Sequence, residues 1–340
     1  MELKNTTFAF LALALFGCQE QKYVPVTTFQ EAEDPVAIST EAEQQWNQAG
    51  KKLNVAWGSI DWRYSRSEIP QNLENKPCQL TAWRGEKASA QLLLWSAGGS
   101  NGVTCQIGEF KADKASLPAS IAQARFVRYT LADINSPDFK KGGPSVLMPD
   151  MLDSLSRFDM APKTTRPVWI TIQVPQDAVA GTYTSTITVT DQEREKFTFP
   201  IQLKVIDHVL PTPDQWNYHL DLWQHPAAVA RAEGLKMWRI PLAKAGQKVI
   251  TATLNKDPWN HQCYDAYEDM ITWTRHKDGS WSYDYQIFDR WVEMMLSIGI
   301  NRMINCYSMV PWNCELDYFD EAENKKVTVV ATPGKPEFTQ

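Results

Sequence analysis

The residues best suited to chemistry in this chain lie between positions 218 and 226, in the order Tyr-His-Leu-Asp-Leu-Trp-Gln-His-Pro. His219, Asp221, Trp223 and His225 place two imidazoles, a carboxylate and an indole within seven residues. At the carboxyl end of a strand in an α/β fold, such a set is typical of a binding or catalytic site. The same residues would also suit a strand end with a satisfied histidine, followed by a helix N-cap. The sequence around this segment has to decide between the two interpretations.

Two later segments carry side chains of the same kind. They are Asp257, Trp259, Gln262, Tyr264 and Asp265 after a predicted strand at 247–254, and Tyr307, Met309, Trp312 and Asn313 after a predicted strand at 302–307. Aromatic rings stack on the C–H faces of sugars, while amide, imidazole and carboxylate groups bind sugar hydroxyls. We therefore predict a glycan-binding site at three strand ends, made by His219, Asp221, Trp223, His225, Trp259, Gln262, Tyr264, Tyr307, Met309 and Trp312. Because tryptophan also fills large cores, most of the eight between 216 and 312 are expected to be structural.

The elements that must position these residues follow the order strand, loop, helix, strand, loop. Residues 226–233 read as a helix with proline in its first turn, and apolar residues repeat with a helical period at 287–296 before Gly299. This βα order predicts a parallel sheet with function at the carboxyl ends of its strands. We expect residues 211–340 to form the N-terminal half of a (β/α)₈ catalytic barrel, because a whole barrel takes about 250 residues.

The preceding region, residues 43–210, is predicted to be an all-β sandwich domain. Apolar residues alternate at 168–174, 183–190 and 197–205, which indicates three successive antiparallel strands with short turns. Paired prolines at 211 and 213 mark the boundary to the barrel. A disulfide between Cys78 and Cys105 is one option, although buried free thiols are the default for these cysteines.

Several functional classes are disfavoured by composition and by missing motifs. The net charge of −6, the pI near 5.5 and the lack of a Lys/Arg run argue against nucleic acid as a partner. The chain has no glycine-rich phosphate loop and no G-x-S-x-G motif, which argues against dinucleotide binding and serine hydrolysis. No His/Cys spacing suits zinc, so we expect neither a metal nor a cofactor.

The first residues are predicted to be a targeting segment. Lys4 precedes an apolar run at 8–16, and Gly17-Cys18 then resembles a bacterial lipoprotein processing site. Residues 1–17 would be the signal peptide, Cys18 the lipidated residue and residues 18–42 a tether on the bacterial cell envelope, with the membrane as a partner through the lipid. An ordinary signal peptide with an incidental cysteine is the alternative.

Longer motifs resemble those of glycoside hydrolase family 123. They are His-Leu-Asp-Leu-Trp-Gln-His-Pro at 219–226 with 228–231, Gly-Gln-Lys-Val-Ile-Thr at 246–251, Asp-Pro-Trp at 257–259, 283–285 with 288–291, and Cys-Tyr-Ser-Met-Val-Pro-Trp at 306–312. Segments 174–175 and 180–183 are similar to that family's N-terminal domain. The resemblance implies a β-N-acetylgalactosaminidase that uses substrate-assisted retention, in which the sugar's own acetamido oxygen is the nucleophile.

The resemblance also implies a catalytic pair, an adjacent Asp-Glu on a strand that follows the 306–312 block after a further helix. We expect this pair after residue 340, so the chain as given would be an inactive fragment whose catalytic residues are unknown. Asp320-Glu321 lies in a charge-rich run that reads as a turn. A glycan-binding surface lipoprotein without catalysis is the alternative function, and a non-functional gene fragment is a third reading.

Overall fold

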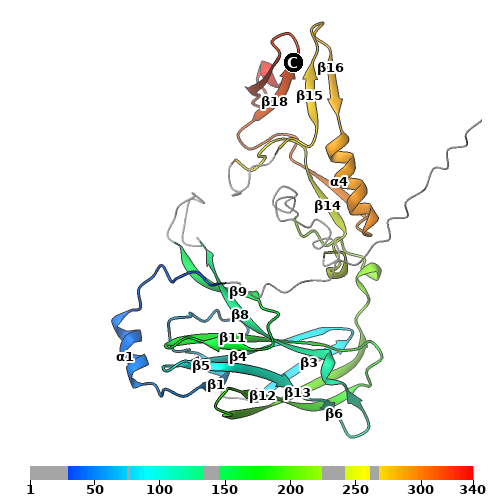
Figure 1. Ribbon diagram of the computed structural model, residues 1–340. Coiled ribbons are helices and arrows are strands. Elements are labelled where there is room, and N and C mark those ends of the chain that lie inside the picture. Colours follow the sequence, from blue (N-terminus) through cyan, green and yellow to red (C-terminus); the bar gives the residue numbers. More distant parts are fainter. Residues whose placement is uncertain (1–29, 75–76, 133–144, 224–241, 261–267, 340) are drawn as a thin grey trace, which may run out of the picture.

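The computed structural model describes residues 30–74, 77–132, 145–223, 242–260 and 268–339. A short helix, α1 (Thr40–Gln48), precedes a two-layer β-sandwich, and a second, smaller part follows a linker that starts after β13 (Figure 1). Pro213 opens a 3₁₀ turn in this linker, and Thr212 forms its capping box with Gln215.

The first sheet of the sandwich has six strands in the order β2-β1-β4-β11-β8-β9. Their bounds are β1 (Asn54–Gly58), β2 (Leu73–Glu74), β4 (Lys87–Ser96), β8 (Ala122–Ala132), β9 (Val146–Leu152) and β11 (Thr164–Gln173). The central strand β4 contains Leu92, Leu93 and Leu94, which are all fully buried. Both faces of this strand are therefore covered, which explains its continuous apolar run.

The second sheet has the order β10-β5-β12-β13-β3, with two short strands, β6 and β7, beside it. Their bounds are β3 (Cys78–Arg84), β5 (Ser100–Ile107), β6 (Phe110–Lys111), β7 (Ser116–Leu117), β10 (Phe158–Met160), β12 (Gly181–Thr190) and β13 (Lys196–Val209). Tyr183, Ile187 and Val189 of β12 face the first sheet and are fully buried, and the residues between them are more exposed. This is the period of two that the sequence shows.

The three predicted successive antiparallel strands are only partly correct. β12 pairs antiparallel with β13 over the whole length of β12, but β11 pairs with β4 and β8 in the other sheet. The connection between β11 and β12 crosses from one sheet to the other, and its residues Val174 and Ala178 are buried in the core. The hydroxyl of Tyr183 donates to the carbonyl of Val179 at 2.7 Å and holds this crossing, as a tyrosine corner does.

The disulfide option is wrong, and the default of free thiols is confirmed for Cys78 and Cys105. Cys78 lies on β3 and Cys105 on β5, and two strands separate these in the sheet. Strands lie about 4.8 Å apart, so three spacings put the two cysteines far beyond bridging distance. Burial raises the pKa of Cys78 to about 11 and that of Cys105 to about 12.

The second part contains a parallel pair, β14 (Val249–Thr253) and β17 (Met303–Tyr307). Leu220 forms an isolated parallel bridge with Gln247, so the 218–223 segment runs beside β14 without forming a longer strand. Helix α4 (Gln286–Ser297) packs Trp291 and Met295 against Ile250 and Ala252 of β14. The helix ends at Ser297, and Gly299 follows the cap residue Ile298 with a φ of +90° that suits glycine. This is the predicted βα arrangement, but the described residues form no barrel.

The loops after β14 and β17 carry a separate four-stranded sheet, the loop sheet, in the order β16-β15-β18-β19. Its strands are β15 (Thr272–Arg275), β16 (Trp281–Asp284), β18 (Glu315–Asp320) and β19 (Lys325–Val330), and a short helix α5 (Pro336–Thr339) follows. β15 with β16 and β18 with β19 are two hairpins, which join through the parallel pairing of β15 and β18. In Figure 1 this loop sheet stands above β14, on the side away from the sandwich. The predicted helix at 226–233 lies outside the described residues.

Candidate functional site

Three aromatic side chains from three neighbouring segments meet at the carboxyl ends of the parallel strands. The rings of Trp223 and Trp259 stack with centroids 6.0 Å apart and an interplanar angle of 18°. The Tyr307 ring lies 5.2 Å from Trp223 and 5.1 Å from Trp259. Trp259 is 6% exposed and forms the base of this aromatic cluster, whereas Trp223 is 61% exposed and presents its ring to solvent.

A polar layer lies beside this aromatic cluster on the strands themselves. Thr251 of β14 donates to Asp221 Oδ1 at 3.2 Å, and Asn305 of β17 donates to Asp221 Oδ2 at 3.3 Å. Thr251 and Asn305 are register partners, and the neighbours of Thr251 along β14 pack on α4. Because side chains alternate along a strand, the Asp221 layer lies on the face opposite to the helix.

Hydrogen bonds between side-chain amides and the backbone fix the loops that carry the aromatic cluster. The buried side-chain amide of Asn255 donates to the backbone carbonyls of Ser308 and Met309, both at 3.1 Å. Gln247 Oε1 accepts from the amide of Leu222 at 2.7 Å, one residue before Trp223. The Asn255 bonds therefore join the loop after β14 to the loop after β17. The Gln247 bond fixes Leu222, the residue before Trp223.

The loop sheet is fastened by a buried carboxylate. Asp317 is 2% exposed in its side chain and accepts from Lys256 and Lys326, each at 2.9 Å, and from Thr328. Burial alone would raise the Asp317 pKa, but the hydrogen bonds from Lys326, Thr328 and Lys256 outweigh it and lower the pKa to about 2. Lys256 immediately follows Asn255, so this ion cluster joins the loop sheet to the strand ends.

The structure brings together four of the ten predicted binding residues. These are Asp221, Trp223, Trp259 and Tyr307. Met309 and Trp312 lie on the same loop region with exposures of 66% and 56%, and His219 is exposed. His225, Gln262 and Tyr264 lie outside the described residues.

The sequence reasoning missed Thr251, Asn305 and Asn255. The signal that could have found them is a polar residue inside an otherwise apolar strand, because Thr251 is 1% exposed between buried Ile250 and Ala252. Such a residue needs a hydrogen-bond partner, and here the partner is a predicted site residue.

Asp320 and Glu321 are held in structural contacts. Asp320 is 6% exposed, and its Oδ1 accepts from the amides of Ala322 and Glu323 in the turn between β18 and β19. Glu321 pairs with His276 at 2.9 Å. The predicted turn is therefore present, although Asp320 itself is buried.

Within the described ranges, no group of three or more His, Cys, Asp or Glu side chains could hold a metal ion. A search of the same part of the chain for helices long and apolar enough to cross a membrane found none.

Comparison with known proteins identifies two adjacent matches to one family. Residues 57–191 match the glycoside hydrolase 123 N-terminal domain, and residues 223–340 match the glycoside hydrolase 123 catalytic domain. Among solved structures, the chain is similar to a family 123 glycoside hydrolase from Clostridium perfringens whose structural analysis addressed glycolipid glycan hydrolysis. The identity is 27% and the TM-score is 0.75. The match covers 84% of this chain and 53% of that one, so this chain spans about half of its length.

Other solved structures resemble the chain much less. A PapD-like domain of human CEP192 is 11% identical with a TM-score of 0.22, covering 55% of this chain and 99% of its own. The periplasmic chaperone SfaE is also 11% identical, with a TM-score of 0.24, covering 48% of this chain and 61% of its own. Scores this low bear on neither fold nor function. A search of curated proteins found no match.

Proposed function

Because the chain belongs to glycoside hydrolase family 123, we propose that its strand-end site binds a terminal β-linked N-acetylgalactosamine. The observation that supports this most is the aromatic cluster of Trp223, Trp259 and Tyr307 beside the Asp221 layer. An exposed indole offers a face for the sugar ring, and a carboxylate held by two neighbours offers a fixed acceptor for a hydroxyl or amide. The parallel pair β14 and β17 with α4 is proposed to begin a β/α barrel.

The proposed reaction is substrate-assisted and retains the anomeric configuration. The acetamido oxygen attacks the anomeric carbon while a glutamic acid protonates the leaving oxygen, and the glycosidic bond breaks. Water then attacks the anomeric carbon and gives its proton to the same glutamate, so the acetamido group is restored. A neighbouring aspartate orients the acetamido group. We propose that these two residues are an adjacent Asp-Glu on a barrel strand after residue 340.

In this proposal the described residues bind and orient the sugar and transfer no proton. Asp320 accepts hydrogen bonds in a turn and Glu321 forms an ion pair with His276. These contacts support the proposal that Asp320 and Glu321 are not the catalytic Asp-Glu pair. Residues 30–340 are accordingly expected to bind the sugar without hydrolysing its glycosides.

We also propose that Cys18 carries lipid and holds the protein on the bacterial cell envelope. The support is sequence alone, namely the apolar run at 8–16 followed by Gly17-Cys18. Cys18→Ser should move the protein from the membrane fraction to the soluble fraction, and an unchanged distribution would contradict the anchor.

The experiment for the proposed function uses a chain extended through the whole barrel, assayed on aryl β-N-acetylgalactosaminides. We expect hydrolysis with retention, and a loss of about ten-fold or more in kcat/KM for Trp223→Ala, because one stacked aromatic contributes about 1–3 kcal/mol. Trp62→Ala is the matched control, since Trp62 is 53% exposed but belongs to the sandwich. Absence of turnover on every N-acetylhexosaminide would refute the proposal, and equal losses in the two variants would remove Trp223 from the site.

A further inference from the structure

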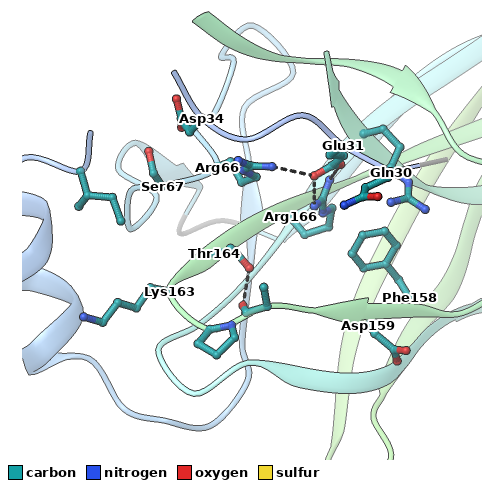
Figure 2. Close-up of a pocket in the computed structure, with 14 residues that line it drawn as sticks. Gln30, Glu31, Asp34, Arg66, Ser67, Phe158, Asp159, Lys163, Thr164 and Arg166 are labelled. Atoms are coloured by element: carbon teal, nitrogen blue, oxygen red, sulfur yellow. Dashed lines mark hydrogen bonds and ion pairs between the residues drawn. The ribbon is translucent and has the colours of Figure 1, made fainter. Parts of the chain in front are cut away.

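A second cluster of charged side chains lies far from the strand ends, where the segment before α1 meets the sandwich. A cleft of about 700 Å³ is lined there by Arg66, Arg128, Arg166 and Phe158 on the sandwich side. Figure 2 shows Glu31 reaching across this cleft to Arg66 and Arg166.

The carboxylate of Glu31 accepts hydrogen bonds from three different residues. Both terminal nitrogens of Arg166 donate to it, one to each oxygen, with Nη2 at 2.9 Å from Oε2. Arg66 Nη1 donates at 3.3 Å, and the backbone amide of Tyr129 donates at 3.0 Å. A bidentate arginine and a backbone amide on one carboxylate are the contacts of a binding site rather than of a loose surface pair.

The sandwich holds the receiving arginines in place by its own contacts. The side chain of Arg166 is 5% exposed. Its guanidinium donates to the carbonyl of Val127 at 2.7 Å and lies 4.4 Å from the ring centroid of Phe158. Arg128 lies 4.6 Å from the same ring and pairs with Asp153, which supplies its own counter-charge. Among the described residues, the carboxylate that forms ion pairs with Arg66 and Arg166 is that of Glu31.

Apolar burial contributes little to holding the segment that carries Glu31. Val36 and Ile38 are 55% and 43% exposed, and Glu33 is exposed. Within the described part of the chain, the hydrogen bonds that join this segment to the sandwich are those of Glu31 and that of the Ala32 carbonyl, which accepts from Arg66 at 3.1 Å. Burial raises the Glu31 pKa, but the bonds from Arg166 outweigh it, so the net pKa is lowered and the group is ionised at neutral pH.

We propose that Arg66 and Arg166 form a carboxylate-binding site in the sandwich, which the chain fills with its own Glu31 and which thereby fixes the segment before α1. The site is separate from the strand-end site and does not depend on the proposed function. Its ligand class is a carboxylate, so a small free carboxylate should bind when Glu31 is removed.

The test uses the full chain with Glu31→Ala, and Glu33→Ala as the matched control. Glu31→Ala leaves the buried Arg166 and the partly buried Arg66 without this carboxylate, and we expect its melting temperature to fall by about 6 °C or more. Glu33→Ala should stay within about 1 °C of the parent. Acetate should restore about 3–6 °C to Glu31→Ala at about ten times its Kd, and chloride at equal ionic strength should not. Arg166→Met in the Glu31→Ala background should abolish the acetate effect.

A second readout follows the segment itself. Thermolysin cleavage before Val36 or Ile38 should be at least ten-fold faster in Glu31→Ala than in Glu33→Ala, and acetate should slow it. If Glu31→Ala does not fold alone, refolding in acetate but not in chloride supports the site, and Glu31→Gln supplies the proteolysis comparison. Parent-like melting of Glu31→Ala, or equal effects of acetate and chloride, would overturn the proposal.

Discussion

The sandwich and the strand-end region use polar and aromatic side chains in opposite ways. In the sandwich, Arg166 and Glu31 are less than 10% exposed and are paired with each other. At the strand ends, Trp223, Met309 and Trp312 are 56–66% exposed. A closed cluster stabilises the fold, because separating its charges is costly, whereas exposed rings retain surface for a ligand.

The two regions also differ in their cores. The sandwich has one continuous cluster of buried apolar residues that spans both sheets. The described residues of the second part form a smaller cluster, made of Ile250, Ala252, Met270, Trp291, Met295 and Ile300. Equivalent truncations should therefore cost more in the sandwich. The following predictions test the comparison of the two regions, from the largest expected effect to the smallest.

Leu94→Ala removes a fully buried side chain from the central strand of the sandwich. We expect a loss of about 2–5 kcal/mol in the free energy of unfolding, because a cavity remains. Ile300→Ala in the smaller cluster is the counterpart, since Ile300 is also fully buried, and it should cost about 2 kcal/mol, the low end for such truncations. Guanidinium unfolding followed by circular dichroism measures both. Similar losses in the two variants would erase the contrast.

Asp317→Asn tests the buried ion cluster of the loop sheet. The Asp317 pKa is about 2, below its ordinary value of 3.8, so ionised Asp317 stabilises the fold above about pH 4 and this contribution is lost as the pH falls towards 2. We expect Asp317→Asn to cost about 2 kcal/mol at pH 7 and much less near pH 2.

The measurement is urea unfolding at a series of pH values, and Asp177→Asn at an exposed position is the control for Asp317→Asn. A difference between Asp317→Asn and the parent that did not shrink on acidification would show that the carboxylate's charge is not what holds the loop sheet.

Tyr183→Phe should have the smallest effect. It removes one hydroxyl that donates to Val179 at the crossing between the sheets, and we expect a loss of about 1 kcal/mol. Tyr285→Phe is the control because Tyr285 is 47% exposed. Thermal unfolding can resolve this difference, and equal melting temperatures would show that packing alone fixes the crossing.

The sequence predicted those features that depend on local pattern. The alternation in β12 and β13 and the helical face of α4 are periodicities within one segment, and the structure confirms them. Sheet membership was not predictable in the same way. β11 pairs with β4 and β8 and not with β12, and the connection through Val174 and Ala178 is buried in the assembled core, which a local pattern does not show.

The candidate site shows the same limit. Asp221, Trp223, Trp259 and Tyr307 could be named because unusual residue types follow predicted strands. Their partners Thr251 and Asn305 have ordinary residue types, and only the parallel register places them beside Asp221. Glu31 was hidden for a related reason. Its polar, acidic surroundings read as a tether, whereas its partners Arg66 and Arg166 lie 35 and 135 residues away in the sequence.

If Cys18 carries lipid as proposed, the Glu31 contact would also limit how far the sandwich can move from the membrane. Twelve peptide units separate Cys18 from Gln30, and an extended chain covers at most about 3.6 Å per residue, or about 43 Å in all. A chain free as far as residue 42 would reach about 86 Å. With the proposed lipid on Cys18, one carboxylate would thus halve the radius within which the sandwich can move from the bilayer. The height above the membrane at which a glycan can be met would then be set by Arg66 and Arg166.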